Sequence, residues 1–210
     1  MARREAEPTR SAPRLYLIAA PARGDENGLG AAIRAAGHRV DIAAVLLRRP
    51  AGAAFEPAPL LAAAHEISAA CLAEGDVGAL KQGFDGVHLD GIAALQAAIG
   101  AVHPHGIAGV GGLRTRHDAM TAGELGADYV MFGEPDSAGR RAAFDAVLER
   151  IEWWAQLFEP PCVGYAETLA EADALIGAGA DFIAVGALLL DDPEGVGPAL
   201  AGRLAGAERS

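Results

Sequence analysis

The sequence contains few aromatic residues, a single lysine and only two cysteines. Aromatic side chains make up 5% of the 210 residues although apolar residues make up 51%, so small and branched aliphatic side chains must build the core. Cys71 and Cys162 lack the spacing of metal ligands, and isolated thiols are typical of a reducing cytoplasm. No apolar run reaches the ~18 residues of a membrane span. We therefore expect a cytoplasmic protein without a membrane partner.

The charge balance is strongly acidic. The formal net charge is −11 at pH 7, which argues against nucleic acid or an anionic membrane as the main partner. Residues 1–11 are charged and contain no apolar stretch, so they do not resemble a signal peptide. We predict that residues 1–12 form a disordered tail and that residues 13–207 form one domain.

Short apolar segments alternate with helical patterns throughout this domain. Strands are expected at 14–20, 40–47, 68–73, 83–90, 105–110, 129–132, 162–164 and 182–187. The helical spacing of apolar residues is clearest at 144–158, and a shorter helix at 92–99 is expected to end at Gly100. Thr168 is expected to cap a helix in a capping box with Glu171. Eight strands and eight helical segments favour an α/β protein, a single-domain TIM (βα)8 barrel, over a doubly wound sheet.

A repeated sequence motif precedes three of these strands. Gly83, Gly126 and Gly179 each end a helical pattern, an aspartate follows two residues later, and an apolar strand begins. The aspartates are Asp85, Asp128 and Asp181. Because they lie at strand beginnings, we expect a structural role at the rim opposite the active site.

The active site of a TIM barrel lies at the carboxyl ends of the strands. The residues at these ends are Arg48, Glu74, His88, Asp90, Gly111, Gly112, Gly133, Glu134, Gly164, Gly186 and Ala187. Arg48 and His88 are the candidate catalytic residues. A guanidinium suits a phosphate group, and His88 shares a strand face with Asp90, which permits an acid–base or metal-binding role. The alternative for His88 is packing or hydrogen bonding alone.

Two further groups of strand-end residues suit an anionic ligand. Glu74 and Asp90 lie on neighbouring strand ends and are candidate Mg²⁺ ligands, because Mg²⁺ prefers carboxylate oxygens and retains waters. Backbone amides form the candidate phosphate site, since loops after the seventh and eighth strands of this fold often bind phosphate. The residues concerned are Gly111, Gly164, Gly186 and Ala187. The alternative is that the glycines only relieve crowding in tight turns.

With these strand ends in place, the chain resembles the thiamine phosphate synthase family, whose TenI-like branch includes a thiazole tautomerase. The resemblance extends from about Arg14 to Pro193. Its most specific motifs are Asp85-Gly-Val-His-Leu89 and Gly126-Ala-Asp-Tyr-Val-Met-Phe-Gly133, and Val45-Leu-Leu-Arg48 is similar to a third. The resemblance implies phosphorylated partners: a pyrimidine diphosphate and a thiazole phosphate, which synthases of this family join with Mg²⁺ while expelling pyrophosphate.

Several motif positions of that family differ in this chain. Only Arg48 remains of an Arg-Glu-Lys triplet, Glu74 stands where the family has an aspartate, and Gly111 replaces a serine. The Thr-x-Thr-Lys loop is replaced by the short acidic segment 134–139. We therefore predict weak or absent synthase turnover with retained monophosphate binding, unless Arg140 or Arg141 reaches the site from this loop.

The sequence is compatible with three functions. The chain is an enzyme of thiamine biosynthesis, or a non-catalytic barrel that binds a phosphorylated ligand or a protein partner, or a different phosphate-using barrel enzyme. Trp153 and Trp154 are adjacent on one helix, so at least one indole faces away from the barrel. This indole indicates either a homodimer contact or a peripheral aromatic residue that packs on its own chain.

Overall fold

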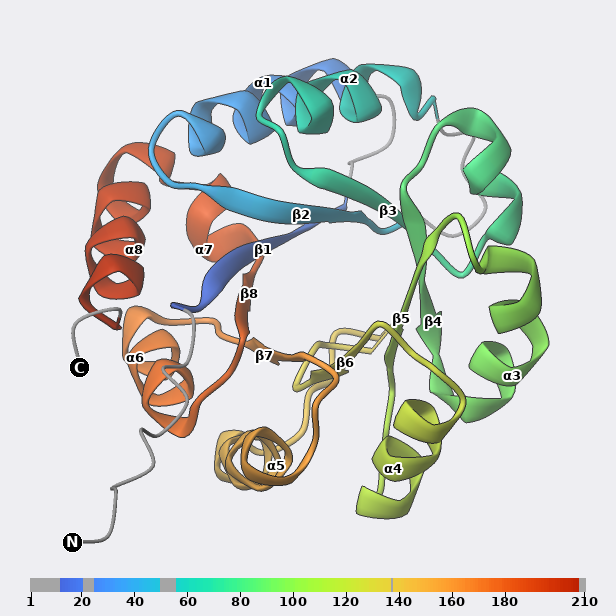
Figure 1. Ribbon diagram of the computed structural model, residues 1–210. Coiled ribbons are helices and arrows are strands. Elements are labelled where there is room, and N and C mark those ends of the chain that lie inside the picture. Colours follow the sequence, from blue (N-terminus) through green and yellow to red (C-terminus); the bar gives the residue numbers. More distant parts are fainter. Residues whose placement is uncertain (1–11, 21–24, 50–55, 137, 208–210) are drawn as a thin grey trace, which may run out of the picture.

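The fold is a closed barrel of eight parallel strands in the order β1 to β8, in which each strand pairs with its sequence neighbours and β8 pairs with β1 (Figure 1). The computed structural model describes residues 12–20, 25–49, 56–136 and 138–207. The strands are β1 Arg14–Ala19, β2 Ile42–Leu47, β3 Ala70–Glu74, β4 Gly86–Asp90, β5 Ile107–Gly111, β6 Tyr129–Phe132, β7 Cys162–Tyr165 and β8 Phe182–Val185. The predicted TIM barrel is confirmed. Of the predicted tail, residues 1–11 lie outside the described residues.

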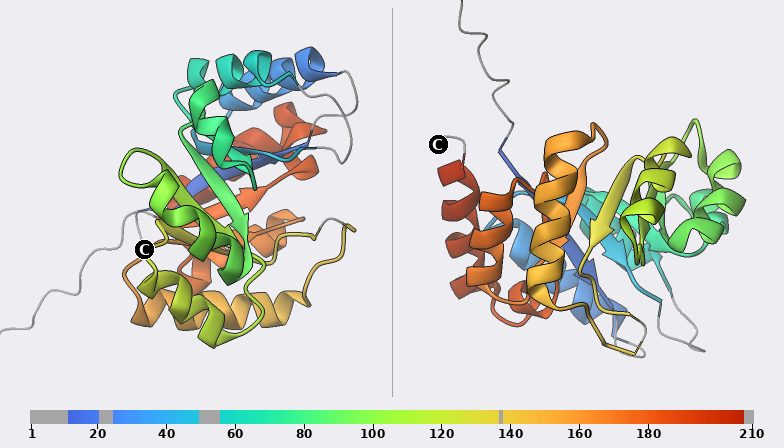
Figure 2. Two further views of the ribbon diagram at one scale, coloured as in Figure 1. Left: turned by 90° about the vertical axis from the view of Figure 1, so that its right-hand side faces the viewer. Right: turned by 90° about the horizontal axis from the view of Figure 1, so that it is seen from below.

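Helices surround the barrel on its outside, and the short helix that follows β8 lies between this outer ring and the strands (Figures 1 and 2). They are α1 Glu26–Gly37, α2 Ala58–Glu66, α3 Gly91–Val102, α4 Arg116–Glu124, α5 Phe144–Leu157, α6 Leu169–Ala178, α7 Ala187–Leu190 and α8 Pro193–Ala207, with a 3-10 helix η1 at Val77–Gln82. Among these described helices, none is long and apolar enough to cross a membrane.

Two predicted boundaries, the end of one helix and the end of one strand, need correction. Helix α3 continues through Gly100 to Val102, because nothing crowds the exposed side of Gly100 and a single glycine weakens a helix without ending it. The strand predicted at 182–187 ends at Val185, and Ala187 begins α7. The cap at Thr168 is present, since its side chain accepts the backbone N–H of Glu171. The Glu171 carboxylate, however, accepts the N–H of Glu167, so the cap is present but the predicted capping box is not.

The core has two layers, one between the strands and the helices and one inside the barrel. The inner layer contains Tyr16, Ile18, Leu46, Leu72, Tyr129, Met131, Val163 and Ala184. Trp154 belongs to the outer layer, where it is fully buried and donates its indole N–H to the Pro160 carbonyl at 2.7 Å. Trp153 is half-buried against Phe158 and Arg116 of its own chain. These contacts agree with the interpretation of Trp153 as a peripheral aromatic residue that packs on its own chain. A homodimer remains a prediction.

The three repeated aspartates have the structural role that the sequence predicts. Each carboxylate accepts a backbone N–H from the preceding strand at the amino-terminal rim: Asp85 from Cys71 at 2.7 Å, Asp128 from Ala108 at 2.7 Å, and Asp181 from Cys162 at 2.8 Å. Through these hydrogen bonds, the aspartates of the repeated motif connect β3 to β4, β5 to β6 and β7 to β8.

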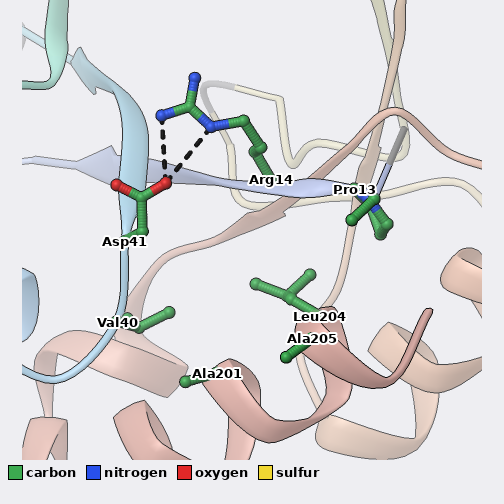
Figure 3. A pocket seen from close by; sticks show the side chains of 8 residues that line it. Pro13, Arg14, Val40, Asp41, Ala201, Leu204 and Ala205 are labelled. Carbon is green, nitrogen blue, oxygen red and sulfur yellow. Dashed lines mark hydrogen bonds and ion pairs between the residues drawn. The ribbon is translucent and has the colours of Figure 1, made fainter. Parts of the chain in front are cut away.

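A similar connection joins β1 to the segment before β2. The Arg14 guanidinium donates to Asp41 Oδ2 at 3.1 and 3.3 Å (Figure 3). A cavity of about 380 Å³ lies beside this ion pair, lined by Ala12, Pro13, Arg14, Val40, Asp41, Ala201, Leu204 and Ala205. It lies at the amino-terminal rim, away from the strand ends where TIM barrels carry their chemistry.

Candidate functional site

The carboxyl ends of strands β2 to β6 surround one pocket of about 570 Å³, here called the acidic pocket. It is lined by Arg48, Arg49, Glu74, Gly75, His88, Asp90, Gly111, Gly112, Glu134, Pro135 and Asp136. The predicted residues Arg48, Glu74, His88, Asp90 and Gly111 thus share one site. Carboxylates outnumber guanidinium groups in this lining, so an anion entering the pocket meets net negative charge.

Arg48 follows β2 and connects two sides of the site. Its Nη1 donates to the Pro135 carbonyl at 2.9 Å, and its Nε lies 3.2 Å from Glu74 Oε1 in an ion pair without good hydrogen-bond geometry. Only 19% of the Arg48 side chain is exposed. A largely buried guanidinium with a carboxylate on one side and a carbonyl on the other is held in place before any ligand binds.

His88 lies inside the barrel and is buried, with 4% of its surface exposed. Its Nδ1 is 2.9 Å from the hydroxyl of Tyr129, which is 2.7 Å from the hydroxyl of Tyr16. Burial, together with the positive charge of Arg48, lowers the pKa of His88 to about 3. The imidazole is therefore neutral at physiological pH. Its hydrogen-bond partner is Tyr129, and Asp90, predicted as its partner, is exposed at the strand end.

Glu134 follows β6 and lines the acidic pocket, although its sequence pattern indicated no role beyond a place at a strand end. Its Oε1 accepts the Gly112 N–H at 2.7 Å. Burial raises the pKa of Glu134 to about 7, while the Gly112 amide opposes the shift. Its position at a strand end was the available signal. In the sequence, the acidic segment 134–139 indicates only that a basic motif is missing. Sequence alone does not show that the Glu134 carboxylate turns into the pocket.

Glu74 and Asp90 come from the neighbouring strands β3 and β4 and line the same pocket. Burial raises the pKa of Glu74; Arg48 lowers it and the negative charge of Asp90 raises it further. Two carboxylates that repel each other across a pocket have the donor chemistry for a divalent cation. Within the described residues, no group of three or more His, Cys, Asp or Glu side chains is placed to hold a metal.

A second pocket of about 450 Å³, here called the β1–β8 pocket, adjoins the first. Its lining is Ile18, Ala20, Asp25, Gly28, Leu29, Ala32, Arg48, Pro135, Tyr165, Gly186, Ala187, Leu190 and Asp191. Arg48 and Pro135 line both pockets, so the hydrogen bond between them forms the wall that separates the two spaces.

The four residues predicted to bind phosphate do not gather at one place. Gly186 and Ala187 line the β1–β8 pocket, whereas Gly111 lines the acidic pocket. Gly164 lines neither, and a Cβ at this position would lie 2.7 Å from the side chain of Leu175 in α6. Side chains alternate along a strand, and because Val163 points into the barrel, Gly164 faces the helix layer. Here the alternative reading, relief of crowding, describes Gly164 better.

The two arginines of the β6–α5 segment are held by carboxylates. Arg140 pairs with Asp136 at 2.8 Å. Arg141 pairs with Glu167 at 2.9 Å and Glu171 at 3.1 Å, and its guanidinium lies 5.8 Å from the ring centroid of Tyr165, which lines the β1–β8 pocket. Moving Arg141 into that pocket would break both ion pairs.

Comparisons with known proteins match most of the chain. A family model described as thiamine monophosphate synthase matches residues 15–189. A thiamine-phosphate synthase from Rhodospirillum centenum is 36% identical over 197 residues, covering 90% of this chain and 94% of the relative. One from Erythrobacter litoralis is 38% identical over 161 residues, covering 72% and 74%. The solved structure of a thiamine phosphate pyrophosphorylase from Pyrococcus furiosus has a TM-score of 0.71 at 20% identity, covering 92% and 96% of the chains.

Proposed function

Because the chain belongs to the thiamine monophosphate synthase family, we propose that it acts in thiamine biosynthesis and binds a phosphorylated thiazole or pyrimidine across the two pockets that meet at Arg48. The observation that carries this proposal is the position of Arg48, the one basic side chain among the described residues that lines both pockets. A planar guanidinium binds phosphate oxygens in pairs. Binding would replace the carbonyl and carboxylate contacts that Arg48 now makes.

Synthase turnover in this chain is expected to be low. A departing pyrophosphate carries about three negative charges, and each missing donor typically costs ~10²–10³ in rate. In the acidic pocket only Arg48 and Arg49 oppose several carboxylates, and Arg49 pairs with Asp76 at 2.8 Å. The distribution of charge therefore favours binding of a monophosphate over stabilisation of a leaving diphosphate.

The acidic pocket also suits Mg²⁺. Glu74 and Asp90 would hold the ion, since Mg²⁺ is commonly bound by one or two carboxylates together with waters and substrate phosphates. Burial is the main cause of the raised pKa of Glu74, and a divalent cation would offset both this burial and the added repulsion from Asp90. When bound, the ion would supply positive charge to phosphate oxygens.

A second candidate activity, proton transfer on a thiazole phosphate, is favoured by Glu134 and His88. Efficient general acids and bases have a pKa near the working pH, and the pKa of Glu134 is raised to about 7. The neutral His88 imidazole lies in the same pocket, and because its pKa is lowered to about 3 it would orient the substrate by hydrogen bonding while Glu134 exchanges the proton. This combination matches proton transfer better than it matches diphosphate displacement.

The test compares Arg48→Ala with Arg39→Ala, whose guanidinium pairs with Glu194 outside both pockets. Calorimetry with thiazole phosphate and with the pyrimidine diphosphate, each with and without Mg²⁺, measures binding, and chromatography measures thiamine phosphate formation. We expect at least 10-fold weaker binding in Arg48→Ala, because a charged hydrogen bond is worth about 1.5–3 kcal/mol, and no change in Arg39→Ala. Absence of binding in the unsubstituted protein, or equal affinity in Arg48→Ala, would contradict the proposal.

A further inference from the structure

Three side chains from distant parts of the sequence form a hydrogen-bonded chain inside the barrel. Tyr16 on β1 contacts Tyr129 on β6, and Tyr129 contacts His88 on β4, with separations of 2.7 Å between the hydroxyls and 2.9 Å to Nδ1. The protein has only three tyrosines. Two of them, Tyr16 and Tyr129, meet inside the barrel with 2% and 7% of their surface exposed. The Tyr129 ring stacks on the His88 ring with an interplanar angle of 19°.

Gly109 on β5 makes this arrangement possible. A Cβ at Gly109 would lie 1.9 Å from Cζ of Tyr129 and 2.3 Å from its hydroxyl oxygen. Any larger residue would therefore displace the ring that joins Tyr16 to His88. The hydroxyl chain and this glycine form one packing unit across the barrel.

The protons of this chain can be counted. Each hydroxyl has one proton to donate, and neutral imidazole has one N–H. If Nδ1 carried that proton and donated it to Tyr129, then Tyr129 would donate to Tyr16. The Tyr16 proton would then have no acceptor, because Tyr16 Oη has no other hydrogen-bond partner within the described part of the chain. A buried donor without an acceptor is costly.

The opposite direction gives both hydroxyl protons an acceptor and gives Nδ1 a donor, so that only the imidazole N–H at the pocket is left for a ligand or solvent. Tyr16 donates to Tyr129, Tyr129 donates to Nδ1 of His88, and the imidazole proton lies on Nε2. In the described residues Nε2 has no hydrogen-bond partner. It lies at the acidic pocket, where an atom placed as a Cβ of Gly111 would be 2.7 Å from Nε2 and 2.0 Å from Glu134 Oε1. An N–H at Nε2 would therefore lie close to the Glu134 carboxylate, whose oxygens can accept hydrogen bonds.

We propose that Tyr16 and Tyr129 are positioning residues that hold His88 as the Nε2–H tautomer, so that the pocket presents an imidazole N–H donor beside the Glu134 acceptor. A ligand that fits this pair carries a hydrogen-bond acceptor, such as a phosphate oxygen or a ring nitrogen, next to a donor. The tautomer is a property of the protein alone. Its effect on ligand binding rests on the function proposed above.

The decisive measurement is nitrogen-15 NMR of the histidine side chains in the unsubstituted protein and in Tyr129→Phe, with His88→Asn used to assign the His88 signals. We expect His88 to show a protonated Nε2 and a bare Nδ1 whose resonance is shifted by an accepted hydrogen bond. In Tyr129→Phe the Nδ1 resonance should move to the position of a free imine nitrogen. A protonated Nδ1 in the unsubstituted protein, or an unmoved Nδ1 resonance in the variant, would overturn the proposal.

Met131→Leu is the matched control, because Met131 is buried on the same strand in the inner core layer and makes no hydrogen bond to the chain of hydroxyls. It should leave the His88 resonances in place. If Tyr129→Phe does not fold, the tautomer in the unsubstituted protein still decides the question. Thiazole phosphate should bind about 10-fold more weakly to Tyr129→Phe and unchanged to Met131→Leu. Failure of the unsubstituted protein to bind refutes the proposed function and leaves the NMR result valid.

Discussion

The carboxylate of Glu134 occupies the space that a side chain at Gly111 would fill. A Cβ on Gly111 would lie 2.0 Å from Glu134 Oε1, far inside van der Waals contact. These residues are 23 positions apart in the chain, on the ends of the neighbouring strands β5 and β6. The absence of a side chain at Gly111 therefore makes room for the Glu134 carboxylate to turn into the pocket.

This relationship predicts the effect of enlarging Gly111. Gly111→Ser should destabilise the protein by about 1–3 kcal/mol, because overpacking in a filled site has that cost. Chemical denaturation measures the change. Glu134→Ala removes the carboxylate that collides, so the double variant should be more stable than the sum of the two single effects predicts. Additive effects would show that Gly111 and Glu134 do not share this space.

Glu134 also predicts a dependence of stability on pH. Its pKa is raised from 4.5 to about 7 in the folded protein. Below pH 4.5 the carboxyl is protonated in both states and contributes no difference. Between pH 4.5 and 7 the unfolded chain releases the proton while the folded protein keeps it, so this group lowers the free energy of unfolding as pH rises.

Glu134→Gln isolates that contribution, because it keeps an acceptor for the Gly112 N–H and cannot ionise. Its stability relative to the unsubstituted protein should rise between pH 4.5 and 7 by on the order of 3 kcal/mol and then stay constant. Urea denaturation at a series of pH values measures this difference. Parallel pH curves for the two proteins would contradict a raised pKa of Glu134.

The aspartates of the amino-terminal rim should differ in their importance for stability. Asp128→Ala removes the acceptor of the Ala108 N–H and the partner of His103, and leaving a strand amide without its acceptor costs about 1–3 kcal/mol. Asp41→Ala on the same rim removes only an exposed ion pair with Arg14, which is worth about 0–1 kcal/mol. Thermal denaturation of both variants tests the contrast, and equal losses would count against it.

Gly164 and Gly186 should respond differently to the same substitution. Gly164→Ala places a Cβ 2.7 Å from the Leu175 side chain, so it should lower stability by about 1–3 kcal/mol without a specific effect on a ligand. Gly186→Ala places its Cβ in the β1–β8 pocket, 3.3 Å from the Ile18 carbonyl oxygen and 3.6 Å from the Tyr165 hydroxyl. It should weaken phosphate binding with a smaller loss of stability than Gly164→Ala. Calorimetry measures phosphate binding and chemical denaturation measures stability in both variants. The reverse pattern would contradict this prediction.

Some features of this protein follow from the sequence alone. Turn glycines and apolar periodicity are local signals, and they located all eight strands and the three aspartates that bind strand amides. The carboxyl ends of parallel strands meet at one face of a barrel. The sequence therefore also placed Arg48, Glu74, His88 and Asp90 in a common pocket.

Other features were decided only by closure of the barrel. Tyr16 and Tyr129 are separated by 113 residues, and their contact exists because β1 and β6 face each other across the interior with Gly109 leaving room for the ring. The wall between the two pockets likewise depends on Arg48 reaching the Pro135 carbonyl, 87 residues away. Local sequence patterns set which residues form a strand. The register and tilt of the closed sheet decide which side chains meet inside it.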